Sequence, residues 1–97
     1  MIKIRLDSTT QHGARFAQEW TITDHDNTEH GVQTDSEWGD IDVQDGGDRE
    51  FDVEGTPVSA RTIVEAAISA ALGPTQDGEE ANIDAAWLEQ ARAFGCL

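Results

Sequence analysis

The chain has 97 residues, which is enough for one domain with one hydrophobic core and too few for two. Its 20 acidic and 6 basic side chains give a formal net charge of −14. That charge excludes nucleic acids and anionic membranes as direct partners, because both are negative, and it favours basic partners or a salt-rich solvent. No apolar run approaches the length of a secretory or membrane-spanning segment, and the single Cys96 has no internal partner. We therefore expect a soluble, cytoplasmic, single-domain protein.

Three strands are predicted in the first part of the chain. Residues 1–7 place apolar side chains at every second position, as a half-buried strand does. After a polar turn at residues 8–13, residues 14–23 alternate in the same way, and residues 24–31 are polar enough to be a loop. Residues 32–38 alternate weakly and predict an edge strand, which a bulge at Gly39 would end.

The next two apolar pairs predict a β-hairpin. Ile41 and Val43 precede the turn formers of residues 45–48, and Phe51 and Val53 follow them. A three-residue loop at 46–48 puts the two apolar pairs on one face, with Val43 opposite Phe51. In this register the carboxylates of the two strands share the other face, so that Asp42 faces Asp52 and Asp40 faces Glu54.

Two helices are predicted in the last part of the chain. Residues 58–74 have apolar side chains at helical spacing, with Ser59 as the N-cap and Gly73-Pro74 as a left-handed end followed by a helix breaker. A polar link at residues 75–81 leads to a second helix with Asn82 as N-cap and an apolar stripe formed by Ile83, Trp87, Ala91 and Phe94. The expected fold is α+β: an antiparallel four-stranded sheet followed by two helices packed on one face, ββββαα.

No sequence pattern indicates catalysis, a metal site or a cofactor. The three histidines have no zinc-ligand spacing, and residues 40–46 depart from the EF-hand pattern at its fifth and sixth positions, which leaves at most loose cation binding. No nucleophile elbow, phosphate-binding loop or dinucleotide fingerprint occurs. We expect a protein that is not an enzyme and holds no cofactor.

Acidic side chains are concentrated between Glu19 and Glu54, where 13 carboxylates accompany a single basic residue, Arg49. Solvated charge on a free face is ordinary, but an ordinary surface mixes the two signs. Like charges opposite each other destabilise a sheet, so folding alone gives no reason for them. The expected partner-binding residues are the acidic side chains of this stretch: Asp24, Asp26, Glu29, Asp35, Glu37, Asp40, Asp42, Glu50, Asp52 and Glu54.

In size, acidity and expected layout, the chain resembles the small phage-encoded anti-CRISPR proteins and the antirestriction DNA mimics. The resemblance implies a non-enzymatic inhibitor of the host cytoplasm that presents its acidic face to a basic nucleic-acid-binding groove. Its target would be a Cascade-like or nuclease complex whose Lys/Arg channel grips DNA. Two alternatives fit the same composition: a small cytoplasmic domain adapted to high salt, as in a halophile, and an immunity or antitoxin protein that neutralises a basic toxin.

Overall fold

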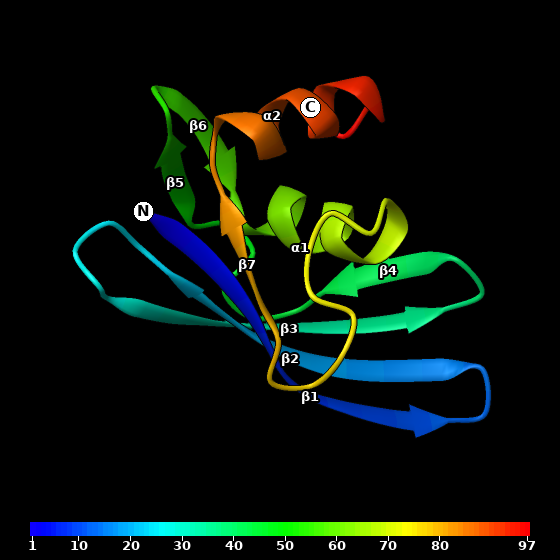
Figure 1. Ribbon diagram of the computed structural model, residues 1–97. Helices are drawn as coiled ribbons and strands as arrows, with labels where there is room; N and C mark the ends of the chain where they lie inside the picture. The colour runs from blue at the N-terminus through cyan, green and yellow to red at the C-terminus, as the bar shows by residue number, and fades with distance from the viewer.

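The computed structural model describes residues 1–97, which form a five-stranded antiparallel sheet, a two-stranded antiparallel sheet and two helices (Figure 1). The elements are, in chain order, β1 (Ile2–His12), β2 (Arg15–Thr23), β3 (Glu29–Glu37), β4 (Asp40–Val43), β5 (Glu50–Val53), β6 (Thr56–Ser59), α1 (Ala60–Ser69), β7 (Glu80–Ile83) and α2 (Ala85–Ala93). The fold is α+β, but the expected ββββαα layout is wrong, because β6 precedes α1 and β7 lies between the helices.

The five-stranded sheet has the order β4-β3-β2-β1-β7. Strands β1 to β4 follow one another as a meander, and β7 returns to pair with the first part of β1, so that Ile2 lies opposite Ile83 and Arg5 opposite Glu80. The expected strand at residues 32–38 is longer than predicted and is not an edge, since β3 pairs with β2 on one side and β4 on the other.

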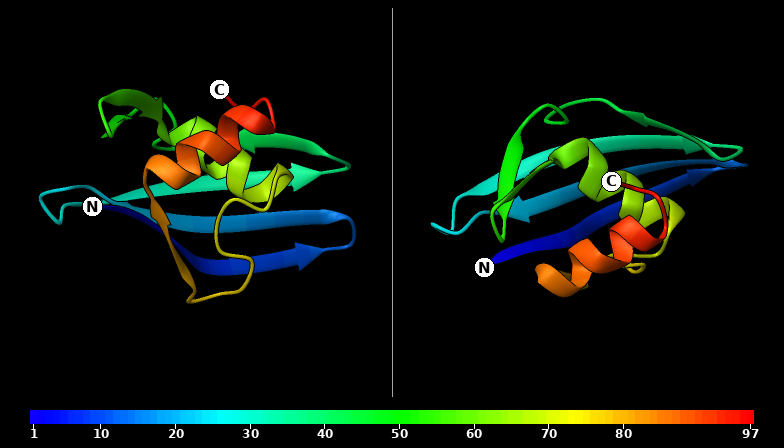
Figure 2. Two further views of the ribbon diagram at one scale, coloured as in Figure 1. Left: turned by 45° about the horizontal axis from the view of Figure 1, so that its top comes forward. Right: turned by 90° about the horizontal axis from the view of Figure 1, so that it is seen from above.

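Both helices and the β5–β6 hairpin lie on the same side of the five-stranded sheet (Figure 2). The alternation in β1, β2 and β3 directs buried side chains toward this inner side, among them Ile4, Trp20 and Val32. α1 meets them with Ile63 and Val64, which are fully buried. No element covers the other, outer side of the sheet, so its side chains face solvent (Figure 2).

The predicted hairpin between residues 41–43 and 51–53 does not form. β4 pairs with β3, while β5 pairs with β6 in the separate two-stranded sheet, where Phe51 lies opposite Val58. Residues 44–49 connect the two sheets instead of forming a tight turn. Gly46 has a φ of 82°, and a Cβ there would lie 2.4 Å from the carbonyl oxygen of Gly31, so the backbone approaches too closely for a side chain.

The ends of the helices differ partly from the prediction. Ser59 is confirmed as the N-cap of α1, because its hydroxyl accepts a hydrogen bond of 3.1 Å from the Thr62 amide. The left-handed residue after α1 is Ala71, with a φ of 54°, and not Gly73. The second helix is capped by Asp84 rather than Asn82, whose segment forms β7. Phe94, expected in the core, is 65% exposed.

β1 runs well beyond the predicted strand and contains a β-bulge. Its pairing with β2 shifts between Leu6 and Ser8, and Asp7 is the extra residue. The strand then continues to His12 without apolar side chains, where neither β7 nor a helix accompanies it (Figure 1). Neither helix is long and apolar enough to cross a membrane.

Candidate partner-binding surface

Four of the ten predicted binding residues come together on the outer side of β3 and β4. The register places Asp35 directly opposite Asp42 and Glu37 directly opposite Asp40. Side chains in such cross-strand pairs have Cβ atoms about 5 Å apart, so their charges repel. We call these four residues the acidic patch. The like-charge pairs expected from the sequence thus exist, but between β3 and β4 and not within a hairpin of residues 40–54.

Arg15 is the basic side chain that contacts the acidic patch. Its Nε donates to both carboxylate oxygens of Asp35, at 2.8 and 2.9 Å, and its Nη2 also contacts Asp35. The hydrogen bonds from Arg15 hold the pKa of Asp35 below its ordinary value and raise the pKa of Arg15. No ion pair is formed by the patch carboxylates of Glu37, Asp40 and Asp42. Three charges of one sign therefore remain uncompensated on this face.

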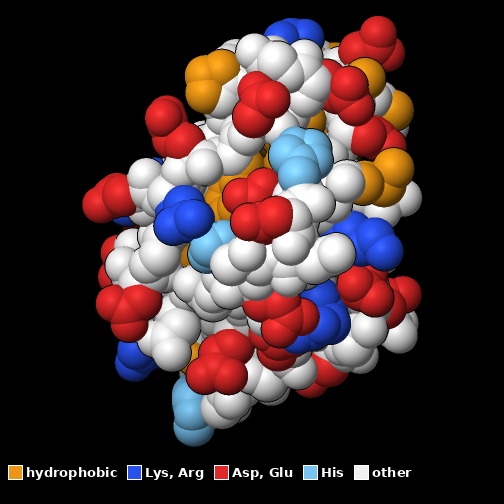
Figure 3. Space-filling model, turned by 90° about the vertical axis from the view of Figure 1, so that its left-hand side faces the viewer, with side chains coloured by type: hydrophobic (Ala, Val, Ile, Leu, Met, Phe, Trp, Pro, Cys, Tyr) orange, Lys and Arg blue, Asp and Glu red, His pale blue; other side chains and the backbone are white.

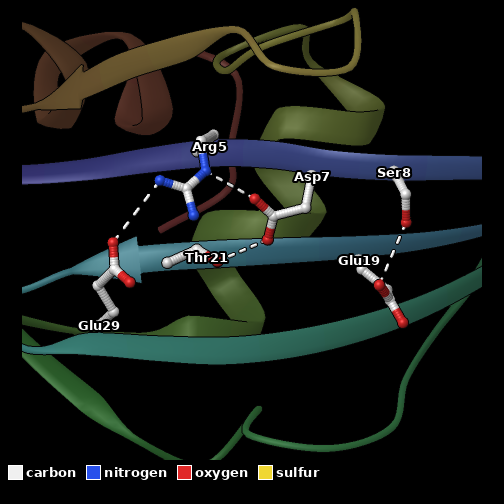
Figure 4. Close-up of polar contacts among 6 residues, drawn as sticks. All are labelled: Arg5, Asp7, Ser8, Glu19, Thr21 and Glu29. Atoms are coloured by element: carbon white, nitrogen blue, oxygen red, sulfur yellow. Dashed lines mark hydrogen bonds and ion pairs between the residues drawn. The ribbon is translucent and has the colours of Figure 1, made fainter.

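A second cluster on the outer side joins one Arg to two carboxylates, so its negative charge is partly compensated (Figure 4). Arg5 donates to Asp7 at 2.6 Å and lies 3.6 Å from Glu29, and the Thr21 hydroxyl donates to Asp7 at 2.5 Å. Partial burial acts to raise the pKa of Asp7, but the hydrogen bonds from Thr21 and Arg5, with the charge of Arg5, lower it overall. Glu29, another predicted binding residue, therefore belongs to a cluster whose charges are partly compensated and lies toward the opposite end of β3 from the acidic patch.

The other predicted residues lie away from the acidic patch. Asp24 and Asp26 belong to the β2–β3 loop, Glu50 and Asp52 to β5, and Glu54 to the β5–β6 turn. Figure 3 views the end of the molecule that faces left in Figure 1, where acidic side chains are scattered with Lys and Arg between them. The ten predicted residues therefore do not form one continuous surface.

Two of the three histidines, His25 and His30, contact the β5 strand and do not belong to a cluster of possible ligands. Nε2 of His25 donates to the carbonyl oxygen of Asp52 at 2.7 Å, which fastens the β2–β3 loop to β5. The ring of His30 makes an edge-on contact with Phe51 at a centroid distance of 5.5 Å. No three His, Cys, Asp or Glu side chains are grouped to hold a metal ion.

Trp38 is a surface residue that was not among the predicted binding residues. It forms the two-residue β3–β4 turn with Gly39, and both have positive φ, 53° and 84°, as a type I′ turn requires. Its side chain is 83% exposed, whereas Trp20 and Trp87 are buried. A Trp-Gly pair between two alternating segments is the sequence signal for this turn, and it was interpreted as a strand end followed by a bulge.

The acidic patch and Trp38 border the same hollow, which has a volume of about 360 Å³ and is also lined by Arg15 and Ile41. Its walls offer carboxylates, one guanidinium and apolar surface, which suit contact with cationic side chains and provide no nucleophile or activated base. Comparison of the chain with protein-family models, with curated proteins and with solved structures found no match. The function is therefore inferred from the geometry of this surface.

Proposed function

We propose that the protein is a non-enzymatic binding protein whose acidic patch docks on a basic surface of a partner protein. The observation that carries the proposal is the pair of like-charge contacts, Asp35 with Asp42 and Glu37 with Asp40, on an uncovered sheet face. These contacts disfavour the fold, and only Asp35 has a cationic neighbour within ion-pair distance. A basic partner surface would supply the missing positive charge.

The class of partner that fits best is a protein that binds nucleic acid. Carboxylates two residues apart on a strand are about 6.7 Å apart, so β3 and β4 present two short rows of negative charge. Phosphates along a nucleic-acid backbone also present regular rows of negative charge to Lys/Arg grooves. A net charge of −14 would attract such a groove at long range and speed association. The proposed action is competitive: the acidic patch occupies a surface that nucleic acid would otherwise bind, as an anti-CRISPR or antirestriction protein does. A cytoplasmic location is part of this proposal.

The test is a pair of charge-reversed variants that differ only in where the charge is changed. The patch variant carries Glu37→Lys, Asp40→Lys and Asp42→Lys. The control carries Glu50→Lys, Asp52→Lys and Glu54→Lys, which change three exposed acids of the β5–β6 hairpin by the same total charge. Asp35 is kept in both variants because it pairs with Arg15.

The measurement begins with capture of partners from cells that carry CRISPR or restriction systems, followed by competition between the protein and labelled DNA for the captured partner. Each reversed charge at a close contact costs more than about 1 kcal/mol, so the patch variant should compete at least tenfold less well while the control competes like wild type. Competition should also weaken as salt rises. Undiminished competition by the patch variant would contradict the proposal.

A neutralised toxin would be a basic partner of a different class. It is distinguished by the same capture, because DNA would not displace the protein from a toxin that does not bind DNA. If the patch variant bound such a partner more weakly, the acidic patch would be supported as the docking surface, and competition with nucleic acid would be contradicted.

Adaptation to high salt is the alternative that a specific observation favours. Exposed acids occur on nearly every part of the molecule, including Asp77, Glu79 and Glu89, and the chain has a single Lys, Lys3. A salt-adapted domain loses structure in dilute buffer and becomes more stable toward molar salt. A binding protein that is not adapted to salt instead folds in dilute buffer. Circular dichroism at low and high salt concentrations would distinguish the two.

A further inference from the structure

The tips of the β1–β2 and β3–β4 hairpins project beyond the helices (Figures 1 and 2). On the inner side of this projecting part, a pocket of about 420 Å³ lies between the strands and the C-terminal end of α1. Its apolar walls come from Phe16, Trp38, Ile41 and Ile68. A second pocket, of about 220 Å³, shares Phe16, Ser36 and Ile68 with the first, so the two form one groove. We call it the tip groove.

Two features of the tip groove are costly to the isolated fold. Trp38 occupies a left-handed turn position that favours Asn or Gly, and its indole is exposed and makes no hydrogen bond. The Ser36 hydroxyl is buried and has no hydrogen-bond partner, although the side chain lines both parts of the groove. Buried polar groups are nearly always hydrogen-bonded, so this hydroxyl is a cost to the isolated fold. The exposed apolar surface of the groove, with Trp38 at its edge, marks it as a docking site for an occupant.

The charge around the tip groove restricts the chemistry of the occupant. Glu37, Trp38 and Ile41 line both the groove and the hollow of the acidic patch, so the two surfaces meet at the β3–β4 turn. An occupant that enters the groove must therefore carry apolar side chains next to positive ones. A second copy of this chain does not fit, because each copy carries a net charge of −14 and would bring more negative charge to the rim.

The conformation of the occupant follows from its hydrogen bonds. The walls of the larger pocket are mainly apolar side chains, and its few polar ones, Ser36, Glu37 and Ser69, cannot pair every group of an unpaired backbone. An extended peptide laid across them would leave amides and carbonyls unsatisfied, whereas a helix satisfies its backbone internally and docks through side chains at i, i+3, i+4 and i+7.

We propose that the tip groove receives an amphipathic helix of the partner protein, with the apolar side of that helix against Phe16, Trp38 and Ile41 and its Lys/Arg side over the acidic patch. This inference rests on the proposed function and specifies the partner's chemistry. Trp38 is the central contact, since large exposed aromatic side chains at the edge of a groove contribute much of the affinity in such complexes.

The experiment uses three labelled peptides of about 14 residues, roughly four helical turns. The first is an amphipathic Leu/Lys helix, the second a scrambled sequence of the same composition, and the third an amphipathic Leu/Gln helix without charge. Binding to the full chain is measured by fluorescence anisotropy. Two variants are compared with wild type: Trp38→Asn, which suits the turn, and Phe94→Ala, which removes an exposed aromatic side chain that does not line the groove.

We expect the Leu/Lys helix to bind wild type at least tenfold more tightly than either other peptide. Trp38→Asn should weaken this binding at least tenfold and raise the thermal midpoint, while Phe94→Ala leaves the affinity unchanged. Equal binding of the scrambled peptide, or no effect of Trp38→Asn, would overturn the inference while leaving the charge-based docking of the proposed function intact. Equal binding of the Leu/Gln helix, or no binding of any peptide, would also overturn it. The proposed function is tested separately from the peptide binding, and it would be contradicted if the patch variant still competed with DNA.

Discussion

The inner side of the five-stranded sheet has two regions with different roles. Where α1 and the β5–β6 hairpin cover it, Ile4, Ile22 and Val32 are fully or almost fully buried. Toward the hairpin tips, on the same strands, Phe16 is 38% exposed and Trp38 83% exposed. The covered region has the burial that stabilises a small domain, whereas the tip region exposes apolar side chains on this side and carries like-charge pairs on its outer side. The region that we assign to binding thus combines exposed apolar side chains with like-charge pairs, both of which oppose folding.

The largest expected loss of stability comes from changing one of two aromatic residues of β2 that point to the same side of the sheet. Trp20 is buried, and its Nε1 donates to the Thr34 hydroxyl at 2.9 Å. Trp20→Ala should reduce the free energy of unfolding by about 3–5 kcal/mol, because it leaves a cavity and a buried hydroxyl without a partner. Phe16→Ala should cost about 1 kcal/mol. Urea unfolding of both variants measures the difference, and equal costs would show that the tip region is part of the core.

A smaller effect on stability is expected from the charged cluster around Asp7 and Arg5. The pKa of this carboxyl is lower in the folded protein than its ordinary value of 3.8. The ionised form therefore stabilises the fold above about pH 4, and this contribution is lost as the pH falls through the lowered folded pKa. Asp7→Asn should lower the thermal midpoint at neutral pH and have little effect near pH 2. A midpoint difference that stays constant with pH would contradict this assignment.

The smallest effect is expected within the acidic patch, where one carboxylate is paired and its neighbour across the strands is not. Asp42→Asn removes a like-charge contact with Asp35 and should raise stability by a few tenths of a kcal/mol at low salt. Asp35→Asn removes the hydrogen bonds from Arg15 and should lower stability slightly. Thermal midpoints at about 20 mM and about 300 mM salt would measure both shifts, which should shrink at the higher concentration. Shifts of the same sign would contradict the pairing.

The parts of the fold that could be predicted from the sequence are those that contact the core. Alternation in residues 1–7 and 14–23 and helical spacing around Ile63 each reflect burial against another element, and the structure confirms a strand or helix at each place. Ser8 to His12 also form a strand, but no helix covers them, so no alternation marks it. The alternation of apolar and polar residues therefore does not reveal a strand where it extends beyond the core.

The strand pairing could not be predicted because the turn signals were ambiguous. Trp38-Gly39 and Glu54-Gly55 each form a two-residue turn with positive φ, yet neither has the Asn or Asp that usually precedes Gly there. Gly46-Gly47-Asp48 was interpreted as a three-residue hairpin loop, although Gly46 is required by its close approach to the Gly31 carbonyl. With the wrong turn chosen, Asp40 was paired with Glu54 and Asp42 with Asp52. The acidity was visible in the sequence, but its grouping into the acidic patch depends on the pairing of β3 with β4.

The most direct test of the account is to locate the contact by backbone amide NMR while the Leu/Lys peptide is added to the full chain. The account predicts that the largest shifts occur in residues 35–42 and beside Phe16 and Ile68, and that they decrease as salt rises. Those shifts should vanish in the patch variant. Shifts that are largest in the β2–β3 loop and in β5, where the other predicted acids lie, would contradict the assignment of binding to the projecting end of the sheet.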